Sequence, residues 1–366
     1  MKVGCRYPMI ADEASRARGD QIVAWLRNYG EKRVNARMID ERRTIPPYVA
    51  NDLGNQGIFG VQVETQYGGS ALRTREVGRI LEQAAAIDLA LGTWILVCLH
   101  PGVRPIATFA QPALKQEVLP QLAAGRLYAG FGQTEPGAGT NFAGMAARAV
   151  AQPGGGWLLS GDKIWIGNSS WAGIVTVIAQ EVDTAGKRRG LIGLAVRPDQ
   201  PGVTIGRELL SMGMRGMVQG ELHFRDVRVA PEALLGEREK GLEVGVDSMS
   251  WSRFSITSTS LGATKRAAQL MLRFATRRQI ALRVYLPSML PVLLEGFRLA
   301  VIFGFTAVLL AEMYASSTGI GHQIASWGEN FQMHRLYAGV LLLAVIAVAV
   351  NEAIRAVEVR CSHWRS

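Results

Sequence analysis

The sequence is poor in cysteine, in aromatic residues and in long uncharged runs. It has three cysteines in 366 residues, and aromatic residues make up 7% of the chain. Cys5, Cys98 and Cys361 form no C-x-x-C pair, so we expect no disulfide framework, no metal site and a reducing compartment. The first residues carry charges instead of the apolar run of roughly 7 to 15 residues that a signal peptide needs. A secretory leader is therefore not expected.

The positive charge of the chain is not concentrated in any segment. The formal net charge is +10 at pH 7, but Lys and Arg are scattered among acidic residues, and no basic run is interleaved with aromatic residues. We therefore expect no nucleic-acid partner. With 48% hydrophobic and 19% charged residues, the chain has the composition of a folded protein and the length for two or three domains.

Two glycine-containing stretches enclose a predicted β-hairpin. Phe131 to Thr140 is F-G-Q-T-E-P-G-A-G-T, and Gly161 to Asn168 is G-D-K-I-W-I-G-N. The alternating segments between them flank the turn P-G-G-G, which predicts two antiparallel strands. Gly137 and Gly139 would let a ligand approach backbone N–H groups, and Trp165 could stack on a flat ring. Ordinary turns and a core tryptophan are the alternative interpretation of the same residues.

Periodic patterns predict helices before these stretches and strands after them. The predicted helices are residues 12–30, 74–87, 89–99 and 114–122, and the predicted strands are residues 173–180, 190–196, 203–208 and 219–227. The short strands indicate a small barrel or sandwich. Segment 89–99 is nearly all apolar but too short for a membrane span, so we expect a buried core helix. His100 could be functional, but its position directly before Pro101 favours an ordinary histidine at a capped helix end.

Five blocks in series resemble the acyl-CoA dehydrogenase family. They are T-E-P-G-A-G, L-S-G-D-K-I-W-I-G-N, L-L-S-M-G-M-R-G-M, L-H-F-R-D-V-R-V-A and L-L-G-E-R-E-K-G, in the order and spacing of the family. The resemblance covers residues 9–279 and implies a helical N-terminal domain, a β-barrel middle domain and FAD held against the barrel. It also implies oxidation of the Cα–Cβ bond of an acyl-CoA thioester, an electron-accepting flavoprotein as partner, and a homo-oligomer.

The resemblance assigns individual residues to the flavin. Phe131, Thr134 and Thr140 fall where the first loop of the family holds the isoalloxazine edge and the pyrophosphate. Trp165 and Ile166 fall where a second loop covers the other side of the ring. Gly167 departs from the usual threonine or serine and offers only its backbone N–H. A Gly167→Thr change is therefore expected to tighten flavin binding.

The resemblance also assigns substrate contacts and raises a question about the catalytic base. Arg253 and Thr140 match positions that contact the acyl-CoA, and Arg278 matches an arginine that reaches FAD across a dimer interface. The base of the family is usually a glutamate in a region to which the resemblance does not extend. Some members place it instead at the position of Ser252. A serine hydroxyl is not basic enough, so no catalytic residue is assigned.

Residues 280–366 resemble a different family, the permease subunits of binding-protein-dependent ABC transporters. The matching segments are L-P-S-M-L-P-V-L-L-E-G-F-R-L-A, E-M-Y-A-S-S-T-G-I-G and A-G-V-L-L-L-A. Uncharged runs at 299–311 and 336–350 are shorter than the roughly 20 residues that a span needs, so each must extend into flanking turns. Arginines lie mainly outside the two runs, which favours a hairpin with both ends in the cytoplasm. Core helices are the alternative.

Taken together, these patterns predict an α+β multi-domain fold. Its parts are a helical N-terminal domain (1–128), a β-barrel flavin-binding domain (129–236), a truncated helical third domain (237–279) and a permease-like segment with a two-helix transmembrane hairpin (280–366). The predicted function is that of an acyl-CoA dehydrogenase-like FAD flavoprotein with impaired catalysis; the alternative is a transporter component. The predicted location is the cytoplasmic membrane, with a lipid bilayer as partner and the flavin domain inside; the alternative is the cytoplasm.

Overall fold

The computed structural model describes residues 11–277, 286–316 and 318–362. The chain forms two compact units, the first ending at Arg266 and the second beginning at Ala267. Helix α8 (Gly241–Arg277) runs without interruption through this boundary.

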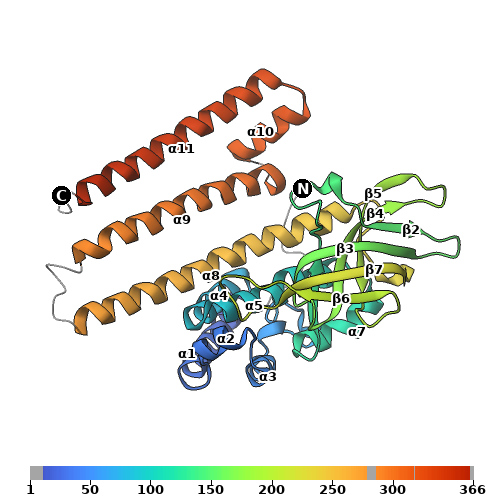
Figure 1. The fold of residues 1–366 in the computed structure, drawn as a ribbon, viewed down its shortest axis with the longest axis horizontal. Helices are drawn as coiled ribbons and strands as arrows, with labels where there is room; N and C mark the ends of the chain where they lie inside the picture. Colours follow the sequence, from blue (N-terminus) through green and yellow to red (C-terminus); the bar gives the residue numbers. More distant parts are fainter. Residues whose placement is uncertain (1–10, 278–285, 317, 363–366) are drawn as a thin grey trace. The chain divides into compact units, whose positions relative to one another are not determined.

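The N-terminal part of the first unit is helical (Figure 1). Its elements are α1 (Asp12–Arg33), α2 (Ala36–Arg42), α3 (Pro47–Asn55), η1 (Ile58–Gly60), η2 (Thr65–Tyr67), α4 (Thr74–Ile87), α5 (Leu89–Val97), η3 (Cys98–Val103), α6 (Arg104–Phe109) and α7 (Pro112–Ala123). In α4, Val77, Ile80 and Leu81 recur at helical spacing and are fully buried against α1 and α5. The helices predicted at 12–30, 74–87 and 114–122 are confirmed.

A continuous apolar segment passes through α5, η3 and α6. It is long enough to cross a membrane, but 78% of its most apolar window is buried inside the fold, which confirms the expected core helix. The middle part, η3, is a π-helix that contains Pro101. Proline has no N–H to donate to the preceding turn, and a widened turn accommodates this loss. The π-helix places His100 inside the protein, with no exposed surface.

The middle of the chain forms one mainly antiparallel sheet. Its strands are β1 (Tyr128–Gly132), β2 (Arg148–Ala151), β3 (Trp157–Gly167), β4 (Ala172–Val182), β5 (Arg188–Val196), β6 (Val203–Glu208), β7 (Gln219–Val229) and β8 (Leu234–Leu235). The predicted hairpin is confirmed as β2 and β3, in which Ala149 pairs with Leu159. The four predicted strands are confirmed as β4 to β7.

The prediction of a closed barrel is wrong. The strand order is β6-β7-β3-β2-β4-β5-β8, with β1 pairing with β4, and β6 and β8 are the open ends of this path among the described strands. β8 has only two residues, and much of β6 is exposed, so neither end offers a long edge for closure. Alternating apolar and polar residues predict that a segment is a strand. Whether the sheet closes into a barrel depends on whether its two edge strands, which are distant in sequence, pair with each other.

The second unit contains three helices after the end of α8. They are α9 (Leu286–Ala315), α10 (Ile320–Glu329) and α11 (Met333–Ser362). α9 and α11 run alongside each other, and α10 packs against both (Figure 1). Arg298 Nε donates to Asn351 Oδ1 at 2.8 Å, and this bond joins α9 to α11.

Two segments of the second unit have the length and composition of membrane spans. They are Val292–Tyr314, of which 0% is buried, and Met333–Ala356, of which 6% is buried. Both predicted apolar runs lie inside these longer helices, as expected. With the buried segment Leu89–Phe109, three helices in the described ranges meet the length and composition of a span, so these criteria alone do not single out a two-helix hairpin.

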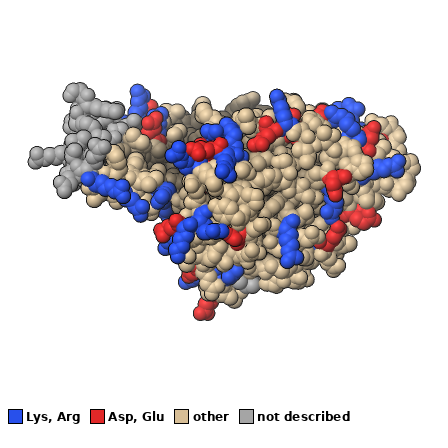
Figure 2. Space-filling view, turned by 60° about the horizontal axis from the view of Figure 1, so that its bottom comes forward, with Lys and Arg blue, Asp and Glu red and all other residues tan. Residues whose placement is uncertain are grey.

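Basic and acidic side chains are mixed on the face of the protein that Figure 2 draws. On the face drawn in Figure 2 the two signs are interspersed, and neither gathers into one large patch. Several exposed groups pair directly; Arg79 Nη2, for example, lies 2.6 Å from Asp20 Oδ1. Such exposed pairs contribute little stability, about 0 to 1 kcal/mol each.

Candidate functional site

The first loop of the site, residues 133–147, joins β1 to β2. Phe131 lies on β1, half-buried, and pairs with Thr176 of β4. Thr140 is exposed, and a Cβ added at Gly137 or Gly139 would meet nothing within 4 Å. The backbone of this loop is therefore open to a ligand that approaches closely.

A buried ion pair holds the base of the first loop. Lys163 of β3 has no exposed surface, and its Nζ donates to Glu135 Oε1 at 2.7 Å. The same ammonium donates to the carbonyl oxygens of Gln133 at 3.0 Å and Ile178 at 2.6 Å. Ala146 N donates to Glu135 Oε2 at 2.6 Å. Burial lowers the pKa of Lys163, and the bond to Glu135 partly offsets this change. These hydrogen bonds to the Lys163 ammonium and the Glu135 carboxylate offset the cost of removing two charges from water.

The first loop meets the second stretch of the predicted site directly. Ile164 N donates to the carbonyl oxygen of Thr134 at 2.9 Å. Trp165 follows Ile164, so this bond places the threonine of the first loop one residue from the tryptophan of the second. The structure thus brings together two stretches that are separated in sequence by the β2–β3 hairpin.

The second stretch has an unusual backbone around its exposed tryptophan. Trp165 has φ 59° and is 52% exposed, whereas Ile166 is buried. Asn168, with φ 63°, is buried; its Oδ1 accepts from Trp94 Nε1 at 3.0 Å, and its Nδ2 donates to Ala129 O at 3.2 Å. A left-handed non-glycine residue costs about 1 to 3 kcal/mol and persists only where its surroundings hold it. The bonds of Asn168 supply that restraint at position 168.

Gly167 ends β3 in close contact with the N-terminal helices. A Cβ at this position would lie 2.7 Å from Val97 Cγ1 on α5. A threonine at position 167 would therefore require the Val97 side chain to shift, and the prediction that Gly167→Thr tightens flavin binding stays a prediction.

The remaining predicted residues lie on or after α8. Arg253 is half-buried on this helix, and its side chain makes no hydrogen bond or ion pair with either loop in the described part of the chain. Ser252 is 7% exposed, and its hydroxyl donates to the Ser248 carbonyl at 2.7 Å. Arg278 lies outside the described residues.

His100 is part of a buried hydrogen-bond chain that sequence analysis did not predict. Its Nε2 lies 2.6 Å from Gln62 Oε1, and its Nδ1 lies 2.5 Å from Ser255 Oγ. Because the Gln62 oxygen can only accept, Nε2 carries the proton, and Nδ1 accepts from the Ser255 hydroxyl. Burial, with a smaller effect of Arg104, lowers the pKa of His100 to about 3, so the ring is neutral. His100 thus joins η3 to α8.

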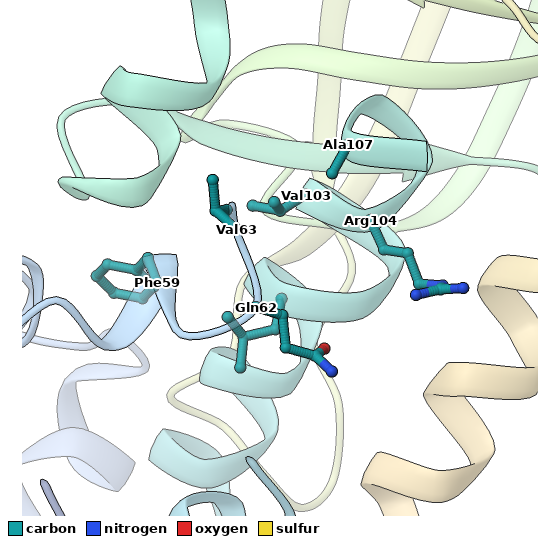
Figure 3. A pocket seen from close by; sticks show the side chains of 7 residues that line it. Phe59, Gln62, Val63, Val103, Arg104 and Ala107 are labelled. Atoms are coloured by element: carbon teal, nitrogen blue, oxygen red, sulfur yellow. The ribbon is translucent and has the colours of Figure 1, made fainter. Parts of the chain in front are cut away.

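A second buried pair lies beside this chain. Arg104 donates to both carboxylate oxygens of Asp247, at 2.6 and 2.9 Å, and its guanidinium lies 4.2 Å from the ring centroid of Trp251. Figure 3 shows the Arg104 side chain pointing from α6 toward the neighbouring helix. The partners are 143 positions apart, so no local pattern could have identified the pair.

The space between these helices is nearly filled. A cavity of about 10 Å³ is lined by Phe59, Gln62, Val63, Leu99, Val103, Arg104 and Ala107 (Figure 3). This volume is about that of a single water site. Among the described residues, this cavity has room for about one water molecule and not for a large ligand.

The two loops have features that fit a flavin. Trp165 presents a flat exposed surface, and the open glycines Gly137 and Gly139 leave backbone N–H groups accessible to a phosphate. Thr134 and Thr140 add hydroxyl groups on the same loop. A ring system and a pyrophosphate are the chemical groups that this combination can hold.

Comparison with known proteins identifies relatives with the same organisation. Residues 17–126 match the family model described as "Acyl-CoA dehydrogenase, N-terminal domain", and residues 130–227 match "Acyl-CoA dehydrogenase, middle domain". A probable acyl-CoA dehydrogenase of Bacillus subtilis (strain 168) is 30% identical over 256 residues, which are 69% of this chain and 67% of that protein. The chain belongs to the acyl-CoA dehydrogenase family.

Other relatives share only part of their length with this chain. A probable acyl-CoA dehydrogenase of Mycobacterium tuberculosis (strain ATCC 25618 / H37Rv) is 28% identical over 274 residues, which cover 74% of this chain but 42% of that protein. The crystal structure of a glutaryl-CoA dehydrogenase from Mycobacterium smegmatis in complex with FADH2 is similar at 27% identity and a TM-score of 0.69. The similarity covers 80% of this chain and 74% of that one.

The end of the chain matches an unrelated family model. Residues 272–362 match "Binding-protein-dependent transport system inner membrane component". This match begins within α8, near the point where the resemblance to the dehydrogenases ends. The chain therefore joins a dehydrogenase-like part to a transporter-like part.

Proposed function

We propose that the first unit is an acyl-CoA dehydrogenase-like flavoprotein that binds FAD between its two loops. The observation that carries the proposal is the bond from Ile164 N to Thr134 O, since it places two family-matched stretches side by side with Trp165 exposed. The residues proposed to contact the flavin are Phe131, Thr134, Thr140, Trp165, Ile166 and Gly167. Arg278 remains a prediction from the resemblance alone.

The roles of the residues follow from their positions. Bound FAD would accept a hydride from the substrate. Trp165 would stack on the ring and Thr134 would offer a hydroxyl to the flavin, while the Lys163–Glu135 pair keeps the first loop in place. Thr140 and Arg253 are proposed to contact the acyl-CoA thioester. An electron-accepting flavoprotein would reoxidise the cofactor, as family membership suggests, and a homo-oligomer is proposed on the same basis.

We further propose that dehydrogenation by this chain is slow. Removal of the substrate Cα proton needs a general base within hydrogen-bond reach. Ser252 cannot serve, since its hydroxyl is weakly basic and already donates to its own helix. The nearby carboxylate of Asp247 has both oxygens bound to Arg104. Neither group is free to take a proton.

The transporter-like part is proposed to anchor the protein in the cytoplasmic membrane. α9 and α11 expose large apolar side chains along their length, including Phe303 at 69% and Leu341 at 69%. Arg273 and Arg277 precede α9, and Arg355 lies near the end of α11, which places basic residues at the two outer ends of the pair. This distribution supports two spans with both ends, and the flavin domain, on the cytoplasmic side. The division into parts 1–128, 129–236, 237–279 and 280–366 is proposed on the same grounds.

Transport is the second candidate function. It is supported by the family match of residues 272–362 and by the two exposed apolar helices. The dehydrogenase-like part, however, accounts for most of the chain, and its two loops meet through the bond from Ile164 N to Thr134 O. A flavin enzyme tethered to a membrane therefore explains more of the molecule than a transporter subunit does.

Flavin retention tests the main proposal. The full-length protein is purified in mild detergent, and its visible absorbance and its melting temperature with added FAD are measured. Retained flavin, or a rise in melting temperature that saturates with FAD, is the expected result. A colourless protein whose melting temperature FAD does not change would contradict the proposal.

Protease protection tests the membrane orientation. Protease added to intact spheroplasts is expected to spare the first unit and to cut, if anywhere, between Glu312 and Arg335. Cleavage in the first unit before the cells are lysed would reject this topology. Recovery of the intact chain in the soluble fraction would reject the anchor.

A further inference from the structure

One interval of the sequence departs from the mixture of charges found in the rest of the chain. No aspartate or glutamate occurs between Asp247 and Glu295. The same interval contains seven basic residues, which are Arg253, Lys265, Arg266, Arg273, Arg277, Arg278 and Arg283. The end of α8 and the chain that follows it are therefore positively charged, and no acidic residue lies near them in the sequence.

The last turns of α8 extend beyond the first unit. Lys265 Nζ donates to Glu82 Oε1 on α4 at 2.5 Å, and a Cβ at Gly262 would lie 2.0 Å from the Glu82 carbonyl oxygen. These contacts attach α8 to the N-terminal helices. The remaining turns, residues 267–277, belong to the second unit. We call them the basic end of α8.

The basic end of α8 has arginine and apolar side chains on one side of the helix. Arg273 and Arg277 are four positions apart, and Leu270 and Phe274 each lie three positions before one of them. Residues at these spacings are neighbours on a helix surface. Leu270 is 48% exposed and Phe274 is 53% exposed. Neither arginine forms an ion pair with any residue that the structure describes.

A hollow of about 530 Å³ lies beside these side chains. It is lined by Leu270, Met271, Arg273, Phe274 and Arg277, so two guanidinium groups and three apolar side chains border the same space. Arginine binds phosphate strongly, and apolar side chains are stabilised by leaving water. A ligand with both an anionic and an apolar part fits this combination. The same face of a second copy would place arginine against arginine, and like charges repel.

The covalent connection to α9 keeps the basic end of α8 close to a candidate membrane span. Only nine positions separate Arg277 from Leu286, the first residue of α9. An extended chain covers at most about 3.6 Å per residue, so these two residues lie within about 32 Å of each other. The apolar segment of α9 begins at Val292. With α9 across the membrane, the basic end of α8 is within reach of the lipid headgroups.

We propose that the basic end of α8 lies on the cytoplasmic surface of the membrane and binds anionic phospholipids. Arg273 and Arg277 contact the lipid phosphates, and Leu270 and Phe274 enter the apolar layer below the headgroups. Amphipathic helices with basic and apolar side chains lie in the plane of the interface in this way. The inference rests on the proposed membrane anchor and adds the class of lipid that the protein binds.

Fluorescence of the labelled full-length protein tests the proposal. An environment-sensitive fluorophore is attached to Gln269→Cys, an exposed position of the basic end. Cys5 and Cys361 are changed to Ser, and Cys98 is kept because it is buried. The protein is reconstituted into vesicles of phosphatidylcholine with increasing amounts of phosphatidylglycerol, and flotation measures its incorporation. The expected result is a blue shift of the emission that grows with phosphatidylglycerol and is absent in phosphatidylcholine alone.

Charge variants separate electrostatic binding from other effects. A basic residue near an anionic membrane surface contributes about fivefold to binding, so Arg273→Gln with Arg277→Gln should lower the ratio of bound to free helix by about 30-fold. Arg273→Lys with Arg277→Lys keeps the charge and should retain most of the shift. Arg37→Gln with Arg207→Gln is the control, because it removes the same net charge from exposed positions of the first unit. This control should shift like the wild type.

The possible negative results are distinguishable. An equal shift in phosphatidylcholine alone would mean that anionic lipid is not selected. No shift in protein that floats with the vesicles would mean that the basic end of α8 stays in water. A shift that depends on protein concentration at constant lipid would mean that a second copy covers it. Each of these results would overturn the inference and leave the anchor intact. Protein that does not float with the vesicles would overturn the anchor and the inference together.

Discussion

Val97 on α5 packs directly against Gly167 at the end of β3, so that a Cβ at position 167 would lie 2.7 Å from Val97 Cγ1. This contact joins the N-terminal helices to the second loop of the flavin site. The glycine that replaces the usual threonine or serine is therefore matched to its neighbour.

The contact predicts that Gly167→Thr needs a compensating change. Alone, it should destabilise the protein by about 1 to 3 kcal/mol, the usual range for overpacking, and it should weaken FAD binding. Combined with Val97→Ala, which removes the clashing methyl groups, it should recover most of the stability and bind FAD more tightly than Val97→Ala does. Urea unfolding and FAD titration measure the two effects. If Gly167→Thr alone is as stable as the wild type, Val97 can move aside at no cost and the prediction is wrong.

The buried pair under the first loop predicts a large effect of neutralising Lys163. Lys163→Met leaves the Glu135 carboxylate buried without its cation, which should cost about 3 to 5 kcal/mol in the free energy of unfolding. Lys240→Met is a matched control, because Lys240 pairs with Glu237 at 2.6 Å on the exposed surface. That change should leave the free energy of unfolding almost unchanged, because water and salt screen an exposed pair. Equal costs for the two variants would mean that the buried pair does not hold the loop.

The neutral His100 predicts a loss of stability in acid. Its pKa is about 3 in the folded protein and ordinarily about 6.5, so the unfolded chain binds one more proton between these values. The contribution of His100 is present above about pH 6.5 and decreases by about 1.4 kcal/mol per pH unit as the pH falls toward 3. His100→Gln, which cannot titrate, should show a shallower slope in urea unfolding between pH 6.5 and 4.5. If the free energy of unfolding depends on pH equally in the wild type and in His100→Gln, His100 does not have the lowered pKa.

Ser252 predicts a catalytic defect that a carboxylate can relieve. The FAD-loaded wild type should oxidise acyl-CoA esters far below about 1 s⁻¹, the low end of ordinary enzymes, in a dye-coupled assay. Ser252→Glu should raise the rate, because a positioned base contributes about 10² to 10⁴-fold. Ser250→Glu is the control. It places the same charge on a different side of α8 and should not raise the rate. Ordinary turnover by the wild type would show that another group acts as base.

Only part of the candidate site could be predicted before the structure was known. Thr134 and Trp165 belong to motifs that are visible in the sequence, and the structure brings their loops together through Ile164. Glu135 and Lys163 lie within the same motifs, but their pairing depends on the β1–β3 arrangement. The role of Arg253 remains a prediction.

The sequence by itself determined the local elements and the family. Apolar residues at helical spacing predict α4 at its observed bounds, and alternating residues predict the β2–β3 hairpin, because each pattern reports neighbours a few residues apart. Only the tertiary structure decided that the sheet is open, that His100 bonds to Ser255 across 155 positions, and that Val97 fills the space beside Gly167. These features depend on which distant surfaces pack together, and side-chain periodicity carries no information about a partner far away in the chain.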